Sequence, residues 1–125
     1  MDPIVNIASE YKLTVIEDCA QSFGSTYADK KAGSLGTAGC LSFFPGKTLG
    51  CYGDGGAIIT QSDTLADNAR MLRNHGSEEK YIYSAKGYNS RLDTLQAACL
   101  LVKMRYIDQW IGRRKKHAQR YKELL

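Results

Sequence analysis

The first third of the chain has the hydrophobic pattern of a short helix, a strand and a hairpin. Residues 4–11 place apolar side chains at the spacing of one helix face, and Asp2-Pro3 before them suits a helix start. The apolar run Leu13–Ile16 predicts a strand that is buried on both faces. Ser25–Leu35 alternates weakly around a polar tip, which predicts a hairpin.

Two more apolar runs flank a glycine-rich turn in the middle of the chain. Cys40–Phe44 predicts a second buried strand, Gly50–Gly56 a tight turn, and Ala57–Thr60 a third strand. Ser62-Asp63 then suits a helix N-terminus, and helical spacing continues as far as His75-Gly76. Strands that alternate with helices indicate an α/β protein.

The last third of the chain combines an irregular stretch with a long helical pattern. Residues 77–88 are polar and aromatic without a clear period, so we expect an exposed loop there. From Leu92 the apolar positions recur at helical spacing to the C-terminus, which predicts a long helix with a kink near Arg105–Asp108. Basic side chains crowd its second half: Arg113, Arg114, Lys115, Lys116, Arg120 and Lys122. No aromatic side chains are interleaved there for base stacking, so we favour a solvated helix face over a nucleic-acid site.

The composition is that of one soluble globular domain. The chain has 125 residues, of which 43% are hydrophobic and 24% charged, and its net charge is +4. No apolar run approaches the ~20 residues of a membrane helix, and the N-terminus lacks the pattern of a signal peptide. We therefore expect a cytoplasmic protein with no membrane partner. The four cysteines show neither a CxxC pair nor metal-ligand spacing, so we expect reduced thiols and no metal site.

Polar residues follow two of the predicted strands, and their types are those that a pyridoxal phosphate (PLP) site requires. Asp18 ends the first apolar run, and Ser42 and Lys47 lie on either side of the break at Pro45-Gly46. A lysine amine can form a Schiff base with this cofactor, and a carboxylate can pair with its pyridinium nitrogen. The same pattern leaves two plainer interpretations open, an ordinary surface lysine at Lys47 and a helix N-cap at Asp18.

Five segments of the chain, in order and with matching gaps, extend this interpretation. They are Val15–Gly24, Gly33–Gly36, Ser42–Lys47, Gly53–Ala57 and Gly87–Arg91. Together they closely resemble the PLP-dependent nucleotide-sugar aminotransferases of the DegT/DnrJ/EryC1/StrS family. Members of that family are much longer, so the resemblance implies that these residues correspond to the central portion of such an enzyme.

The resemblance implies a catalytic role for two residues. Lys47 would be the Schiff-base lysine, and a lysine at this position favours transamination over dehydration, since dehydratase relatives have a histidine there. Asp18, rather than the neighbouring Glu17, would partner the pyridinium nitrogen.

The resemblance also implies further contacts to the cofactor. Gln21 would lie near the ring hydroxyl, Ser42 at the phosphate, and Asn89 at the phosphate of the neighbouring subunit, a role that requires a homodimer or higher oligomer. Without the resemblance, Gln21 is a polar helix residue and Asn89 a turn residue beside a glycine. Arg91 suits a structural ion pair as well as a substrate phosphate contact.

The fold implied by the resemblance is part of the large domain of a fold type I PLP-dependent transferase. This is a three-layer α/β/α arrangement with a mixed sheet, in which the third predicted strand runs antiparallel to the other two. Residues 1–91 would form a partial PLP-binding large domain. Residues 92–125 would form a long helix that leads toward a small domain.

The implied function is transfer of an amino group from an amino acid, expected to be glutamate, to a nucleotide-linked keto sugar in polysaccharide biosynthesis. A different class of function remains open, namely a truncated and catalytically silent domain that acts as an interaction or assembly module. A third hypothesis, a small nucleic-acid-binding protein that uses the basic C-terminal helix, is the least favoured.

Overall fold

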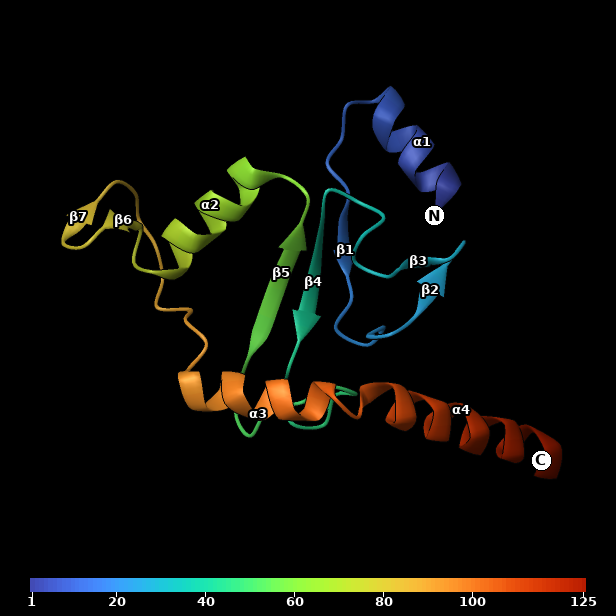
Figure 1. Cartoon of the computed structure of the whole chain (residues 1–125). Coiled ribbons are helices and arrows are strands. Elements are labelled where there is room, and N and C mark those ends of the chain that lie inside the picture. The colour runs from blue at the N-terminus through green and yellow to red at the C-terminus, as the bar shows by residue number, and fades with distance from the viewer.

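The computed structural model describes residues 1–125 as helices and short strands around a three-stranded sheet (Figure 1). The helices are α1 (Asp2–Glu10), α2 (Asp63–Arg73), α3 (Thr94–Met104) and α4 (Ile107–Leu124). The strands are β1 (Ile16–Asp18), β2 (Thr26–Tyr27), β3 (Lys30–Lys31), β4 (Ala38–Ser42), β5 (Gly56–Thr60), β6 (Ser77–Glu79) and β7 (Ile82–Tyr83). The predicted mixed α/β class is therefore confirmed.

The sheet has the strand order β1-β4-β5. β1 runs parallel to β4, with Asp18 opposite Cys40, and β4 runs antiparallel to β5, with Ser42 opposite Gly56. This is the mixed arrangement expected from the sequence. Because β1 and β4 are parallel, their C-terminal ends lie at the same end of the sheet, which is the end beside α3 (Figure 1).

The first strand differs from the prediction in position and burial. It spans Ile16–Asp18 instead of Leu13–Ile16, and the side chain of Ile16 is 65% exposed instead of buried on both faces. The physical reason is that β1 pairs only with β4, so one edge and much of one face lie open. The carbonyl of Val15 accepts N–H groups from Thr37 and Ala38, so the pairing starts where the predicted strand was expected to end.

The main core lies at the α3 end of the sheet. Its buried members are Phe43, Leu49, Cys51, Leu100 and Ile107. The first three come from the turn that joins β4 to β5, and the last two come from α3 and the start of α4. The core therefore packs the β4–β5 turn directly against α3 (Figure 1).

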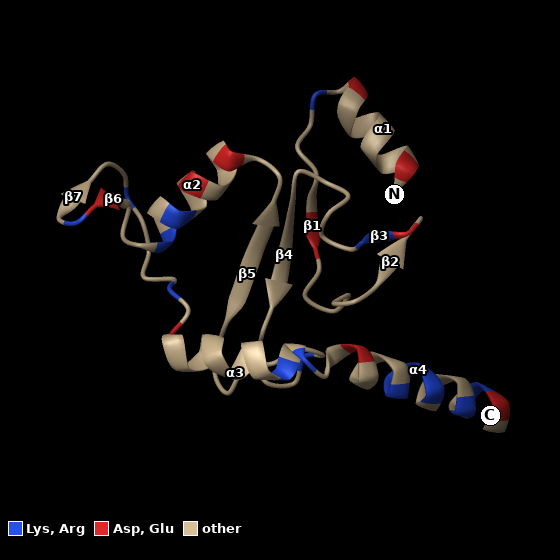
Figure 2. Ribbon diagram, viewed as in Figure 1, with Lys and Arg blue, Asp and Glu red and all other residues tan.

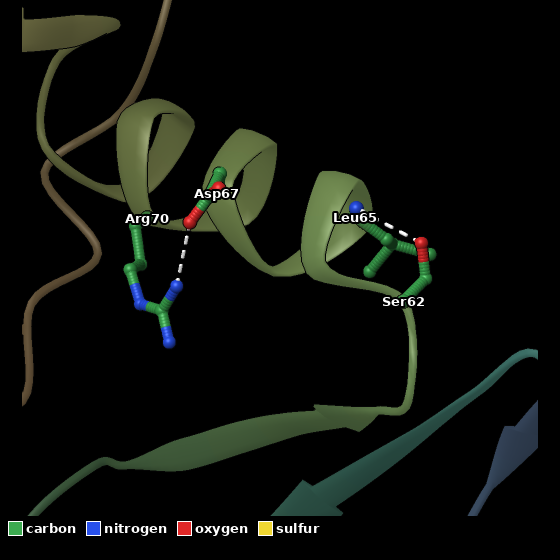
Figure 3. A network of polar contacts seen from close by, with 4 residues as sticks. All are labelled: Ser62, Leu65, Asp67 and Arg70. Carbon is green, nitrogen blue, oxygen red and sulfur yellow. Dashed lines mark hydrogen bonds and ion pairs between the residues drawn. The ribbon is translucent and has the colours of Figure 1, made fainter.

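Helix α2 has the N-terminus that the sequence predicts. The Oγ of Ser62 accepts the N–H of Leu65 at 3.3 Å, which satisfies one of the free donors of the first turn (Figure 3). One turn on, the carboxylate of Asp67 pairs with Arg70 at 2.7 Å, and both side chains are exposed. A cap of this kind stabilises a helix more than an exposed ion pair does.

The remaining elements follow the prediction in part. Residues 25–35 contain the short hairpin β2–β3, as expected. Residues 77–88, expected to be an irregular loop, instead contain the exposed hairpin β6–β7. The predicted kink near Arg105–Asp108 is confirmed, since α3 ends at Met104 and α4 begins at Ile107. The basic residues of α4 are exposed, and the helix projects away from the sheet (Figure 2).

The chain exposes a large surface for its mass. Its accessible surface is 9810 Å² at 13.9 kDa, whereas a compact monomer of that mass exposes about 6,700 Å². Large apolar side chains contribute to the difference, among them Leu95, which is 75% exposed, and Leu101, which is 66% exposed. Much of this surface is apolar and without a partner within the chain. None of the helices combines the length and the apolar character that crossing a membrane requires.

Candidate active site at the end of the sheet

The register of the sheet brings Asp18 and Ser42 to the same face. Asp18 is opposite Cys40, and Ser42 is two residues further along the same strand. Side chains alternate between the faces along a strand, so Asp18, Cys40 and Ser42 share one face at the C-terminal ends of β1 and β4. In open α/β sheets, ligands bind at the C-terminal ends of strands.

The carboxylate of Asp18 has one oxygen engaged and one free. Its Oδ1 accepts the N–H of Ala20 at 3.0 Å, and Oδ2 has no hydrogen-bond partner in the chain. The chain turns after Asp18 and forms no helix there, so the helix N-cap interpretation of Asp18 is wrong. β1 supplies the only charged residues of the three-stranded sheet (Figure 2). The site therefore holds an exposed carboxylate whose second oxygen is available to a ligand.

The neighbouring acid, Glu17, has a different and structural role. Its Oε2 accepts the N–H of Gly33, and its Oε1 accepts those of Leu35 and Gly36, each at 2.7 Å. Burial raises the pKa of Glu17, but these three backbone donors together hold the pKa below its ordinary value. Glu17 thus fixes the 33–36 segment on the face of the sheet opposite Asp18.

Lys47 lies in the turn that follows β4. Its backbone N–H donates to the carbonyl of Phe44 at 2.9 Å, which closes the turn at Pro45-Gly46. The residue is half-buried, and no hydrogen bond or ion pair within the chain engages its ammonium group. Lys47 is therefore less exposed than an ordinary surface lysine, and its amine is available for chemistry.

The turn that carries Lys47 is tightly packed. The sulfur of Cys51 is fully buried and lies 3.0 Å from the carbonyl oxygen of Phe43 and 2.9 Å from that of Gly53. A Cβ at Gly50 would lie 2.5 Å from the carbonyl oxygen of Pro45, so only glycine fits there. The glycine-rich stretch thus allows the backbone to fold closely beside Lys47, as expected from the sequence.

Two residues of α3 that the sequence analysis did not single out hold the same turn. The Oε1 of Gln96 accepts the N–H of Tyr52 at 2.8 Å. The ammonium of Lys103 donates to the carbonyl of Gly50 and lies 4.5 Å from the centre of the Tyr52 ring. Their positions could have been found from helical spacing, because residues 96, 100 and 103 form one face of the helix and Leu100 is its apolar member.

The other two candidate residues differ in their placement. Gln21 is exposed in the turn after β1, close in sequence to Asp18, and its side chain has no partner in the chain. Asn89 pairs through its backbone with Asn74 at the C-terminal end of α2, and β4 and β5 lie between α2 and β1 (Figure 1). The structure therefore gathers Asp18, Ser42, Lys47 and Gln21 at one end of the sheet and leaves Asn89 apart.

Arg91 contacts an amide and not a carboxylate. Its Nη1 donates to the Oδ1 of Asn74 at 2.9 Å, and no acidic side chain pairs with it. The structural ion pair considered for Arg91 is thus absent, and a structural hydrogen bond takes its place.

The chemistry of the gathered side chains fits PLP. A carboxylate with a free oxygen suits a protonated ring nitrogen, a hydroxyl suits a phosphate, and an amine with no internal partner suits the cofactor aldehyde. These groups come from Asp18, Ser42 and Lys47 respectively.

Known proteins resemble this chain over all or nearly all of its length. It is 53% identical to the pleiotropic regulatory protein of Geobacillus stearothermophilus, with 100% of this chain and 34% of that protein covered. It is 52% identical to the UDP-2-acetamido-2-deoxy-3-oxo-D-glucuronate aminotransferase of Pseudomonas aeruginosa, with 96% and 33% covered.

Solved structures agree with this result. The crystal structure of a DegT DnrJ EryC1 StrS aminotransferase from Brucella abortus superposes with a TM-score of 0.93 at 43% identity, with 98% of this chain and 33% of that one covered. The chain thus spans about one third of the length of the relatives it matches. The sequence model of the DegT/DnrJ/EryC1/StrS aminotransferase family matches this chain over residues 1–125. The chain belongs to the DegT/DnrJ/EryC1/StrS aminotransferase family.

Proposed function

We propose that this chain provides the catalytic centre of a PLP-dependent aminotransferase that acts on a nucleotide-linked keto sugar. The observation that carries the proposal is the shared face of Asp18 and Ser42, followed directly by a turn that carries Lys47, whose amine has no partner in the chain. The Pseudomonas aeruginosa relative, which is 52% identical, is named as an aminotransferase of a UDP-linked keto sugar and supports the substrate class.

Each candidate residue has a defined task in this proposal. PLP supplies an aldehyde and an electron-accepting ring. The Nζ of Lys47 would hold the cofactor at its aldehyde and, once released from it, would carry a proton at the reacting carbon. The carboxylate of Asp18 keeps the ring nitrogen protonated, and the hydroxyl of Ser42 binds the phosphate. Gln21 contacts the ring hydroxyl.

Asn89 has its task in the neighbouring subunit. Its placement away from Lys47 supports a contact across a dimer, in which each subunit lends Asn89 to the phosphate site of the other. The large exposed apolar surface also supports association. We further propose a division into a PLP-binding part, residues 1–91, and a helical part, residues 92–125, that connects to a small domain. Glutamate as the amino donor, a cytoplasmic location and a role in polysaccharide biosynthesis complete the proposal.

Covalent trapping tests the proposed function. The segment is placed in a full-length relative, loaded with PLP and treated with borohydride, and the labelled peptide is identified by mass spectrometry. We expect the pyridoxyl group on Lys47 and a near-visible absorption band that Lys47→Ala removes without unfolding the protein. A label on Lys30, Lys31 or Lys103 instead of Lys47 would contradict the proposal.

A further inference from the structure

The structure assigns a positioning role to two residues of α3. We propose that Gln96 and Lys103 hold the turn after β4 in the conformation that presents Lys47 to the site. This inference rests on the proposed function of Lys47, but the contacts that carry it are independent of any cofactor. They join residues that are 44 positions apart in one case and 53 in the other.

The two residues bind consecutive parts of the same turn. Gln96 accepts the N–H of Tyr52, and Lys103 donates to the carbonyl of Gly50 and lies over the Tyr52 ring. Gly50 is buried, so its carbonyl has little access to water, and the Lys103 ammonium satisfies it. The backbone on both sides of Cys51 is thereby fixed to one helix.

Backbone hydrogen bonds within the turn connect these contacts to Lys47. The N–H of Cys51 donates to the carbonyl of Phe43 at 2.8 Å, and the N–H of Lys47 donates to that of Phe44 at 2.9 Å. A backbone held at residues 50–52 therefore also holds the chain on both sides of Lys47. A side chain at residue 50 would collide with the carbonyl of Pro45, so the backbone of the turn packs closely against itself at this point.

Apolar packing alone would not define this conformation. Leu49 and Cys51 pack against Leu100 and Ile107, but such contacts are non-directional and tolerate sliding of one surface over the other. The hydrogen bonds of Gln96 and Lys103 have defined directions and fix the turn along the axis of α3. We therefore assign docking of the turn to the apolar residues and its orientation to the two polar ones.

Four variants of the chain test the assignment. Gln96→Leu and Lys103→Met each remove one polar contact and keep the side-chain volume near that of the original, and Lys103→Arg restores the cation. Arg105→Met is the matched control, because it removes a positive charge from an exposed position at the end of the same helix. Hydrogen exchange of peptides that cover residues 44–55 is the first measurement.

Gln96→Leu and Lys103→Met should each speed exchange in residues 44–55 about tenfold relative to the unmodified chain. Lys103→Arg should largely restore slow exchange, and Arg105→Met should leave it unchanged. Equal exchange in all variants would overturn the proposal. The proposal would also be overturned if residues 44–55 of the unmodified chain exchanged as fast as an unstructured peptide, because α3 would then not restrain the turn.

Labelling of Lys47 is the second measurement, and it separates orientation of the amine from general stability. PLP and borohydride are added to a full-length relative that carries this segment, and the pyridoxyl label on Lys47 is compared with that on the exposed Lys86. We expect the Lys47 to Lys86 ratio to fall at least about threefold in Gln96→Leu and Lys103→Met, and to recover in Lys103→Arg. An unchanged ratio would overturn the positioning role alone, whereas no preference for Lys47 in the full-length relative that carries the unmodified segment would overturn the proposed function itself.

Discussion

Glu17 and Asp18 are consecutive residues of β1 whose carboxylates lie on opposite faces of the sheet and accept different numbers of hydrogen bonds. Glu17 accepts three backbone N–H groups, whereas Asp18 accepts one and keeps an oxygen free. The alternation of side chains along a strand is sufficient to separate the two roles. One acid stabilises the fold, and the other is available to the site.

Asp18→Asn should affect turnover much more than binding of the cofactor. In a full-length relative that carries this segment, we expect a loss of several orders of magnitude in turnover with little change in PLP retention, because the phosphate contacts remain. Steady-state kinetics and the absorbance of the bound cofactor measure the two quantities. Glu17→Gln is the control and should reduce turnover less. The reverse order would mean that Glu17, and not Asp18, faces the cofactor.

Glu17→Gln should lower the free energy of unfolding by about 2 kcal/mol at neutral pH, since an amide cannot accept all three backbone donors. The effect should depend on pH. The pKa of Glu17 is lowered in the folded chain, so its stabilising contribution is complete above the unfolded-state pKa, about 4.3, and is lost as the pH falls through the lower folded value.

Urea unfolding of both chains between pH 7 and pH 3 measures this difference. The difference in free energy of unfolding between the unmodified chain and Glu17→Gln should become smaller toward pH 3. A gap of constant size across the range would show that the carboxylate charge contributes nothing.

Ser62→Ala should destabilise α2 by about 1 kcal/mol, because the N–H of Leu65 loses its acceptor. Thermal unfolding followed by circular dichroism is a suitable measurement. Asp67→Asn is the matched control on the same helix. It should lower the free energy of unfolding by less than about 0.5 kcal/mol, because both side chains of the Asp67–Arg70 pair are exposed. A larger effect at Asp67 than at Ser62 would contradict the assignment of the cap.

The isolated 125-residue chain should not remain a compact monomer. Its surface exceeds that of a compact protein of equal mass by roughly half, and the open edges of β1 and β5 have unpaired backbone groups. We expect association through the Leu92–Leu125 region and these edges, together with weak PLP affinity. Light scattering combined with hydrogen exchange measures both properties.

Leu101→Lys should weaken this association, because it places a charge on the exposed apolar face of α3. Lys86→Gln, at an exposed position before α3 and outside this region, is the control that should leave the association unchanged. A well-protected monomer that binds PLP tightly would contradict the prediction.

Periodic features of the fold could be predicted from the sequence. The helix that begins after Ser62 and the break near Arg105 follow from hydrophobic spacing and capping residues, whereas the antiparallel direction of the third strand was implied by the family resemblance. The family resemblance supplied the order of the strands. These features are local, or they belong to a pattern that many sequences share.

Features that depend on exposure or on distant contacts could not be predicted. The β6–β7 hairpin is exposed on both faces, so no alternation of polar and apolar residues marks it. The strand Ile16–Asp18 contains two acids and lies at a sheet edge. The apolar run that predicted a strand therefore lies N-terminal to the residues that pair with β4. The contacts of Gln96 and Lys103 cross more than forty residues, and no local pattern reports their partners.

The candidate site was predicted as a set of residues, and the structure adds how they are arranged. Asp18 and Ser42 meet through strand register, which sequence spacing alone does not reveal. Asn89 has its backbone partner at the end of α2, so its contact with the cofactor phosphate stays a prediction that depends on a second subunit.

The three backbone N–H groups that donate to Glu17 make the chain a candidate for chemical rescue by a small carboxylate. Three N–H groups that converge on one carboxylate form an oxyanion receptor, which the fold fills with its own side chain. If Glu17 were shortened to glycine, the receptor would be vacant and lined by donors without acceptors. Formate or acetate in the buffer would then restore part of the lost stability in a saturable manner. Chloride would restore less, because it lacks the two acceptor oxygens of a carboxylate.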